Sequence, residues 1–200
     1  MEDHKKQTVE TYDSTASQMA AKFNGIGARI KDIKRGFSYV LRDQPFVLEM
    51  GCGNGRDAEE IIKQTPNYLG VDISKSMIAL AKESVPQGRF EVADVDVWAF
   101  PTGIDLIFSF ASLLHSDPVS VKAVLKRASA ALNSEGVFYI SLKYGEGKHS
   151  KTDEFGTRTY FLYTPEDIIL YAGDDYSVLF EDIQELRGQK WFTIVLRKKH

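Results

Sequence analysis

The chain has 200 residues, of which 43% are hydrophobic and 26% are charged, and its formal net charge is −3. This length and composition predict one globular domain over residues 1–200, and the slight acidity argues against a nucleic acid as partner. Cys52 is the only cysteine, which favours a reducing, cytoplasmic location, and no apolar run reaches the ~20 residues that cross a bilayer, so no membrane partner is expected.

Residues 1–44 are predicted to form a helical cap. Residues 8–23 are mostly polar with scattered apolar side chains, and residues 28–42 carry apolar side chains on a loosely amphipathic pattern. Each of these segments predicts one helix. The pair would either cover the C-terminal end of the following sheet or serve only as outer packing.

Strands and helices alternate from residue 45 onward. The expected strands are apolar runs at residues 46–50, 68–72, 89–93, 104–109 and 136–142. Helices are expected over residues 55–64, over residues 74–85 with Ser74 as N-cap, and from Asp117-Pro118, where an N-cap precedes a first-turn proline. Repeated β-then-α units require a parallel sheet with helices on both faces.

The C-terminal part has a different pattern. Thr164-Pro165 predicts the start of a short helix through residue 170, and strand-like runs follow at residues 177–186 and 191–197. The link between these two runs is so short that they must form an antiparallel hairpin. We therefore expect an α/β fold whose mostly parallel, seven-stranded sheet ends in an antiparallel edge hairpin.

Residues 145–163 connect the fifth strand to the Thr164 helix. Their first part, residues 145–156, is polar, bounded by glycines and longer than an ordinary connection. Near the carboxyl ends of the central strands, this segment would act as a lid that excludes water from a site. A plain surface excursion is the alternative.

Three glycines alternate directly after the first strand, at Gly51, Gly53 and Gly55. Glycine lets the backbone take positive φ and approach a ligand closely at a helix N-terminus. Such a turn is typical of a site for the sugar and polar tail of a nucleotide-like cofactor. A dinucleotide loop of the G-x-G-x-x-G type would need its third glycine one residue later, where the chain has Arg56.

Acidic residues stand at the ends of the first three strands, at Glu49, Asp72 and Asp94. In open α/β sheets, ligands bind beyond the carboxyl ends of the strands. Asp72 is placed to accept hydrogen bonds from ribose hydroxyls, and Asp94 suits an adenine amino group. Each residue alone is more simply a turn or cap residue, but the three together favour a cofactor site.

The run Glu49-x-Gly51-x-Gly53-x-Gly55 resembles motif I of the class I S-adenosylmethionine-dependent methyltransferases. The later segments Gly70-Val-Asp72, Ala93-Asp94 and residues 104–110 fall in that family's order and spacing. Residues 45–200 are thus similar to small bacterial-type members of the family. The resemblance implies a Rossmann-like methyltransferase fold and S-adenosyl-L-methionine as the cofactor.

The resemblance also implies a cofactor-binding set. In the family, the glycine loop holds the methionine part, and the acidic residue before the loop lies near the amino group. The acid after the second strand holds the ribose, neighbouring positions surround the adenine, and the end of the fourth strand runs beside the sulfonium. The positions implied here are Glu49, Gly51, Gly53, Asn54, Gly55, Asp72, Ile73, Met77, Asp94, Val95, Ser109 and Phe110.

A small molecule is the expected methyl acceptor. The chain lacks the Asn/Asp-Pro-Pro-Tyr signature of enzymes that methylate exocyclic amino groups, and it has no cysteine near strands four and five for pyrimidine C5 chemistry. His115 is the best-placed general base, with packing against the Asp117 helix as the alternative. Tyr12, Tyr144 and Tyr160 are candidates to line the substrate pocket. No metal site is predicted.

Two other functions share these motifs. One is a nicotinamide-dependent oxidoreductase on a similar fold, against which Arg56 speaks. The other is a catalytically silent cofactor-binding or interaction module. A fold alone does not decide among the three functions, because one fold serves many chemistries.

Overall fold

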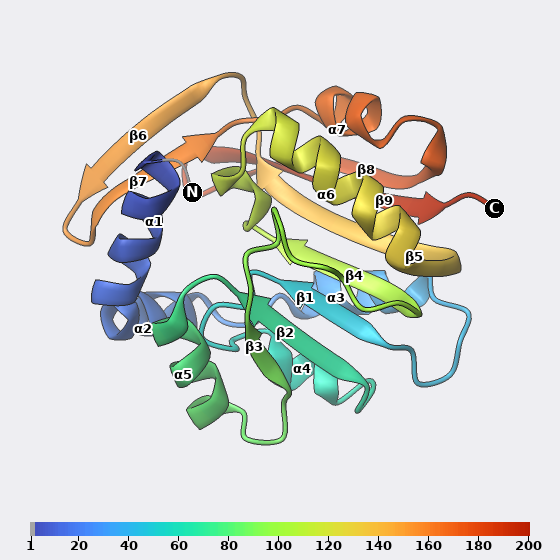
Figure 1. Ribbon diagram of the computed structural model, residues 1–200, viewed down its shortest axis with the longest axis horizontal. Coiled ribbons are helices and arrows are strands. Elements are labelled where there is room, and N and C mark those ends of the chain that lie inside the picture. Colours follow the sequence, from blue (N-terminus) through green and yellow to red (C-terminus); the bar gives the residue numbers. More distant parts are fainter. Residues whose placement is uncertain (1–2) are drawn as a thin grey trace.

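A seven-stranded sheet with helices on both faces organises the computed structural model, which describes residues 3–200 (Figure 1). The strands are β1 (Val47–Met50), β2 (Tyr68–Asp72), β3 (Phe90–Val92), β4 (Ile104–Phe110), β5 (Leu132–Lys143), β6 (Lys148–Asp153), β7 (Gly156–Phe161), β8 (Tyr176–Leu186) and β9 (Gln189–Lys198). The strand order is β3-β2-β1-β4-β5-β9-β8. Strands β1 to β5 are parallel, and β9 is antiparallel to both of its neighbours. The predicted fold class is therefore confirmed.

Helices cover the two faces of this sheet over separate apolar cores. The helices are α1 (Asp3–Ser14), α2 (Ala16–Ile26), α3 (Ile30–Ser38), α4 (Ala58–Ile62), α5 (Lys75–Ser84), α6 (Pro118–Ala131) and α7 (Pro165–Ala172), with short 3₁₀ turns η1 (Leu113–His115) and η2 (Gly173–Asp175). On one face, Val124 of α6 and Ile168 of α7 are fully buried in one core. On the other face, Ile33, Ile61 and Ile78 bring α3, α4 and α5 into a second core. This double coverage is what the β-then-α alternation predicts.

Side-chain caps fix where three of the helices begin. Ser74 accepts a hydrogen bond from a backbone N–H of the first turn of α5, and Asp117 accepts one from Ser120 N at 2.9 Å. Thr164 forms a reciprocal capping box at the start of α7. The predicted caps at Ser74 and Asp117 are confirmed. None of the helices described between residues 3 and 200 is long and apolar enough to cross a bilayer.

The first predicted helix is two helices in the structure. Helix α1 ends at Ser14 and α2 begins at Ala16, with Thr15 at φ −119° and ψ 18° between them. The hydroxyl of Ser14 donates to Glu10 O and that of Thr15 to Thr11 O, both at 2.7 Å. Hydroxyls that bond back to the preceding turn bend a helix. The bend lets α1 lie against β7 while α2 packs against α5.

Residues 145–163 contain an ordered β-hairpin, which the sequence pattern did not predict. Strands β6 and β7 pair antiparallel as a separate two-stranded sheet. Most of β6 is exposed, whereas the last four residues of β7 are buried. Helix α1 covers this strand, with Thr159 N donating to Thr8 Oγ1 at 3.1 Å and Thr11 Oγ1 donating to Thr157 O at 2.9 Å. Opening of the hairpin as a lid stays a prediction.

The Asp117 cap gives a test of how α6 is held just after the η1 turn. Asp117→Ala should lower the free energy of unfolding by about 1 kcal/mol, because Ser120 N–H loses its acceptor. Asp117→Asn should stay within about 0.5 kcal/mol of the wild type, because asparagine caps as well as aspartate. Urea-induced unfolding measures both variants. Equal losses would show that charge, and not the capping bond, holds the helix start.

Candidate cofactor and substrate site

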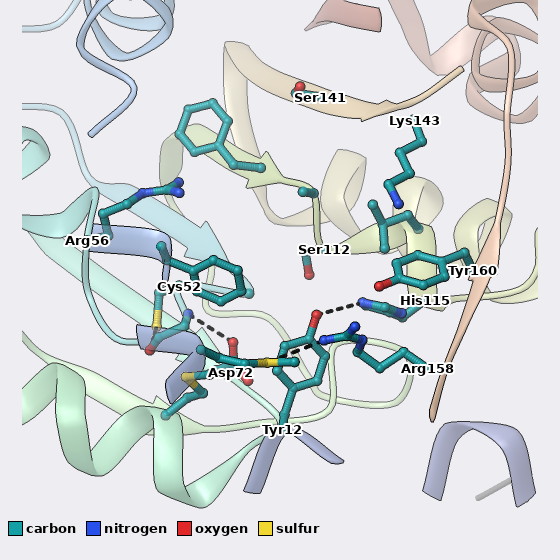
Figure 2. A pocket seen from close by; sticks show the side chains of 18 of the residues that line it. Tyr12, Cys52, Arg56, Asp72, Ser112, His115, Ser141, Lys143, Arg158 and Tyr160 are labelled. Atoms are coloured by element: carbon teal, nitrogen blue, oxygen red, sulfur yellow. Dashed lines mark hydrogen bonds between the residues drawn. The ribbon is translucent and has the colours of Figure 1, made fainter. Parts of the chain in front are cut away.

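A pocket of about 760 Å³ opens at the C-terminal ends of β1 and β4, where the strand order reverses. Its walls come from the loop after β1, the ends of β2, β4 and β5, the helices α1 and α2, and the β6–β7 hairpin. Figure 2 shows two ends of this space: Asp72 and Arg56 lie at one end, and His115, Lys143 and Tyr160 lie at the other. The two ends differ in chemistry.

The glycine loop forms the floor of the first end. Gly51, Gly53 and Gly55 have φ values of 70°, 56° and 78°, in the region that favours glycine. A Cβ atom at Gly51 would lie 2.2 Å from Ser112 Oγ, so the protein itself needs a glycine there. A Cβ atom at Gly53 would meet nothing within 4 Å. Gly53 therefore borders open space in the pocket, into which a ligand fits.

Asp72 ties the glycine loop to the start of α5. Its Oδ2 accepts a hydrogen bond from Gly53 N and its Oδ1 one from Ser74 N, each at 2.9 Å. Burial raises the pKa of this carboxyl, and the two N–H donors oppose that rise. Each oxygen keeps a further lone pair for a hydroxyl donor. Ile73 and Met77 line the pocket beside it.

Glu49 is buried at the bottom of the same end. The residue is 2% exposed, and its Oε2 accepts a hydrogen bond from Tyr68 Oη at 2.5 Å. Burial raises its pKa well above the ordinary value, and the nearby Asp57 carboxyl adds to the rise. A cationic ligand next to this carboxyl would offset the cost of its burial.

Asp57 lies between two arginines beside Glu49. Arg29 donates to it from the backbone N at 2.8 Å and from Nη1 at 3.0 Å, and Arg56 forms a second ion pair with the same carboxylate. Burial raises the pKa of Asp57, and Arg56 opposes that rise. Two guanidinium groups and a buried carboxyl in one place match the carboxylate and ammonium of an amino-acid moiety.

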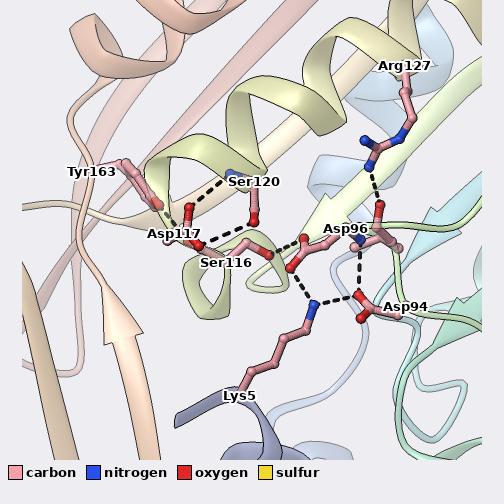
Figure 3. Close-up of polar contacts among 9 residues, drawn as sticks. Lys5, Asp94, Asp96, Ser116, Asp117, Ser120, Arg127 and Tyr163 are labelled. Carbon is pink, nitrogen blue, oxygen red and sulfur yellow. Dashed lines mark hydrogen bonds and ion pairs between the residues drawn. The ribbon is translucent and has the colours of Figure 1, made fainter. Parts of the chain in front are cut away.

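Asp94 lies where a charged network meets the pocket (Figure 3). Lys5 Nζ of α1 is 2.5 Å from Asp94 Oδ1 and also forms an ion pair with Asp96. Ser116 Oγ donates to Asp96 Oδ1 at 2.7 Å, which links this network to the end of η1. Val95 lines the pocket between the two aspartates. The network joins α1 to the loop after β3.

His115 and Tyr12 form a hydrogen-bonded pair at the second end. His115 Nδ1 lies 2.7 Å from Thr159 O, which can only accept, so Nδ1 carries the proton. The other nitrogen, Nε2, lies 3.1 Å from Tyr12 Oη and accepts from it. Burial lowers the pKa of His115 to about 4, with further lowering by Arg158 and Lys143. Burial also raises the pKa of Tyr12, so both groups are neutral at pH 7.

Most of the predicted site residues line this pocket. They are Tyr12, Glu49, Gly51, Gly53, Asn54, Asp72, Ile73, Met77, Asp94, Val95, Phe110, His115 and Tyr160. The structure thus brings the ends of β1, β2, β3 and β4 together with α1 and β7. The role of each residue toward a ligand stays a prediction.

Three predicted residues do not line the pocket. A Cβ atom at Gly55 would lie 3.3 Å from Ala81, so this glycine serves the packing of the loop on α5. The Ser109 side chain is fully buried, and its Oγ has no hydrogen-bond partner among the described residues. Tyr144 forms an isolated bridge with Tyr163 and packs against the core beneath α6 and α7. Packing and backbone pairing, and not the pocket, therefore account for these three positions.

Several lining residues carry charge that the sequence reasoning did not assign to the site. They are Lys5, Arg29, Asp57, Lys143, Lys151, Asp153 and Arg158. Lys5 lies on α1 and pairs with Asp94, 89 positions away, and Arg29 directly precedes α3 and pairs with Asp57, 28 positions away. Lys143 is the last residue of β5, the strand next to β4. Its place at the end of a central strand is the one sequence feature that could have assigned it to the site.

Comparison with known sequences identifies a related domain. Residues 47–136 match the family model described as a methyltransferase domain. A trans-aconitate 2-methyltransferase of Rhodopseudomonas palustris is 34% identical over 98 residues, which cover 48% of this chain and 38% of that protein. The enzyme of the same name from Variovorax paradoxus is 34% identical over 99 residues, with the same coverage. The match thus spans about two fifths of the length of these relatives.

Solved structures extend the likeness to the fold of the whole chain. A 1,6-didemethyltoxoflavin-N1-methyltransferase of Burkholderia thailandensis, with bound 1,6-didemethyltoxoflavin and S-adenosylhomocysteine, superposes with a TM-score of 0.73 at 18% identity, covering 100% of this chain and 92% of its own. An S-adenosylmethionine-dependent methyltransferase of Clostridium acetobutylicum gives 0.72 at 16% identity, covering 92% and 98%. Residues 47–136 thus match a methyltransferase domain, and the whole chain has the fold of S-adenosylmethionine-dependent methyltransferases.

Proposed function

We propose that this protein transfers a methyl group from S-adenosylmethionine to a small-molecule nucleophile. The observation that carries the proposal is the open space at Gly53, which lies beside the Asp72 carboxylate and near the Glu49 carboxyl. Among the described residues, neither of these carboxyl groups has a cationic side chain as hydrogen-bond partner. These two carboxyl groups therefore favour a positively charged group or hydrogen-bond donors on the ligand.

The residues of this end would hold the cofactor by its separate parts. Arg29, Arg56 and Glu49 suit the amino-acid part, and Asp72 suits the ribose hydroxyls. Asp94 would face the adenine amino group, with its charge shared by Lys5. When bound, S-adenosylmethionine supplies a methyl group that its sulfonium already activates. The protein then has to align the acceptor and exclude water.

Helix α1 and the β6–β7 hairpin are placed to exclude that water. Tyr12 and Tyr160 come from these two elements and line the pocket on either side of His115. Both ring nitrogens of His115 are engaged, so any proton that it takes up would pass through the Tyr12 hydroxyl. Its proposed role is to hold that hydroxyl toward the acceptor and, where the acceptor needs deprotonation, to take the proton.

The names of the relatives support a small acceptor. Trans-aconitate and 1,6-didemethyltoxoflavin, which appear in those names, are both small molecules. Titration calorimetry with S-adenosylmethionine, S-adenosylhomocysteine and NAD tests the proposal. We expect both sulfur compounds to bind and NAD not to bind. Binding of NAD alone would contradict it.

Gly53→Ala should separate cofactor binding from folding. Its φ of 56° disfavours a side chain, so we expect a loss of about 1–2 kcal/mol in stability and, because the new methyl enters the ligand space, at least about tenfold weaker S-adenosylhomocysteine binding. Gly173 also has positive φ, at 57°, borders open space and lies outside the pocket, so Gly173→Ala should lose stability as well but keep native affinity. Native affinity in a folded Gly53→Ala variant would show that no ligand approaches this loop.

Asp72→Asn tests the ribose contact. The change keeps the shape of the side chain, removes its charge and turns an amide NH2 toward one of the backbone N–H groups that Asp72 binds. Calorimetry should therefore show S-adenosylhomocysteine binding weakened by about 10–100-fold, through lost charge-assisted hydrogen bonds and a less well held loop. Asp174→Asn, on the exposed η2 turn, changes the net charge equally and should leave affinity unchanged. If both variants bind alike, Asp72 does not contact the cofactor.

The buried His115 should make stability fall in weak acid. Its folded-state pKa of about 4 lies below the ~6.5 of an unfolded chain, so its contribution is complete above pH 6.5 and is lost as the pH falls toward 4. Between pH 7 and pH 5, the wild type should lose about 2 kcal/mol more stability than His115→Gln in urea unfolding. His149→Gln, on the exposed face of β6, is the matched control and should follow the wild type. If the free energy of unfolding changes with pH in the same way in all three proteins, the His115 imidazole is not buried in its neutral form.

A further inference from the structure

The second end of the pocket is basic. The lining residues that β5, β6 and β7 contribute include three cations, Lys143, Lys151 and Arg158, and one carboxylate, Asp153. Asp153 pairs with Arg158 at 2.5 Å and lies 3.6 Å from Lys151. One carboxylate cannot balance three cations. This end therefore carries a positive charge that the described side chains leave uncompensated.

Arg158 keeps unused hydrogen-bonding capacity in this place. The residue is only 6% exposed. Its Nη2 binds Asp153, whereas Nη1 faces the weak acceptor Met19 Sδ at 3.7 Å. Its Nε has no partner among residues 3–200. A buried guanidinium normally satisfies its donors with oxygen acceptors, so this cation gains from an added anion.

Lys143 is a half-buried cation held by aromatic rings. Its Nζ lies 4.0 Å from the centre of the Tyr160 ring and 6.0 Å from that of Trp191. Within the described part of the chain, no carboxylate forms an ion pair or hydrogen bond with it. Burial lowers its pKa, and repulsion from Lys151 and Arg158 adds to the effect. An anion next to Nζ would relieve both penalties.

We propose that this basic end binds a carboxylate group of the small-molecule substrate, with Lys143 as its main partner and Arg158 as a second source of positive charge. This inference rests on the proposed function, since the glycine-loop end is assigned to the cofactor. The two ends then differ in charge balance: at the loop end each cation is paired with a carboxylate and Asp72 and Glu49 have no cationic partner among the described residues, whereas the lysine and arginine opposite leave positive charge for an anion. Figure 2 shows Lys143 pointing into the space bounded by Tyr160 and His115.

Calorimetry on the full chain saturated with S-adenosylhomocysteine tests the inference without any turnover. The probes are two matched series: succinate, succinamide and 1,4-diaminobutane, and benzoate, benzamide and benzylamine. Each series keeps its carbon skeleton and changes the polar end group from anionic to neutral to cationic. We expect at least one carboxylate to bind with a Kd of about 1 mM or lower, and its amide and amine to bind at least about tenfold more weakly.

Variants of Lys143 locate the binding. Lys143→Met keeps a long apolar stem between the rings and should weaken the carboxylate at least about tenfold, while Lys143→Arg should keep it within a few-fold. Neither variant should change S-adenosylhomocysteine affinity. Lys148→Met is the matched control, because Lys148 also lies over an aromatic ring, that of Phe161 at 5.3 Å, but outside the pocket.

The possible failures are distinct. If S-adenosylhomocysteine does not bind, the proposed function fails, and the same probes titrated into the unloaded protein still test the basic end. If no carboxylate in either series binds, or if an amide or amine binds equally well, the carboxylate site is overturned. A carboxylate that binds equally to Lys143→Met and the wild type also overturns the assignment.

Discussion

The carboxylate of Asp72 is the contact on which the geometry of the site depends. It accepts backbone N–H groups from Gly53 and Ser74, and so it joins the loop after β1 to the first turn of α5. Ser74 in turn caps α5 and donates to Asp13 Oδ1 of α1 at 2.6 Å. A single half-buried acid thus fixes the loop, the helix start and, through one further hydrogen bond, the covering helix. The glycines permit the loop conformation, whereas Asp72 selects it.

Helix α1 connects the two ends of the pocket. It carries Lys5, which pairs with Asp94 and Asp96 beside the cofactor end, and Tyr12, which donates to His115 at the basic end. Ser116, which directly follows His115, donates a hydrogen bond to Asp96 and so joins the Lys5 network to the neighbourhood of His115 (Figure 3). A ligand that competes with Lys5 for Asp94 would therefore act on the same helix that places Tyr12. Both ends of the pocket thus contact the same helix.

Local sequence patterns predicted the parts of the fold that are held by local rules. The apolar runs of β1, β2 and β4, the glycine loop, and the caps at Ser74 and Asp117 depend on neighbours along the chain, and their positions in the structure agree with the prediction. The β6–β7 hairpin was not predicted because β6 is polar and exposed, so its sequence shows no alternation of apolar and polar residues. What orders the hairpin is α1, more than 140 residues away, through contacts such as Thr11 with Thr157. Tyr12 and His115 are likewise far apart in the sequence, so their pairing was not predicted. The uncompensated charge of Lys143 appears only when the end of β5 meets Tyr160 of β7.

Both ring nitrogens of His115 are hydrogen-bonded, and this limits which methyl acceptors the pocket suits. A general base works best with a pKa near the operating pH and with a free nitrogen facing the proton to be removed. His115 has neither, because burial lowers its pKa to about 4 and its two nitrogens already bind Thr159 and Tyr12. A poorly acidic alcohol or amine would therefore receive little help from it. A carboxylate is ionised at neutral pH and needs no proton removed, so the basic end and the weakly basic histidine favour the same class of substrate.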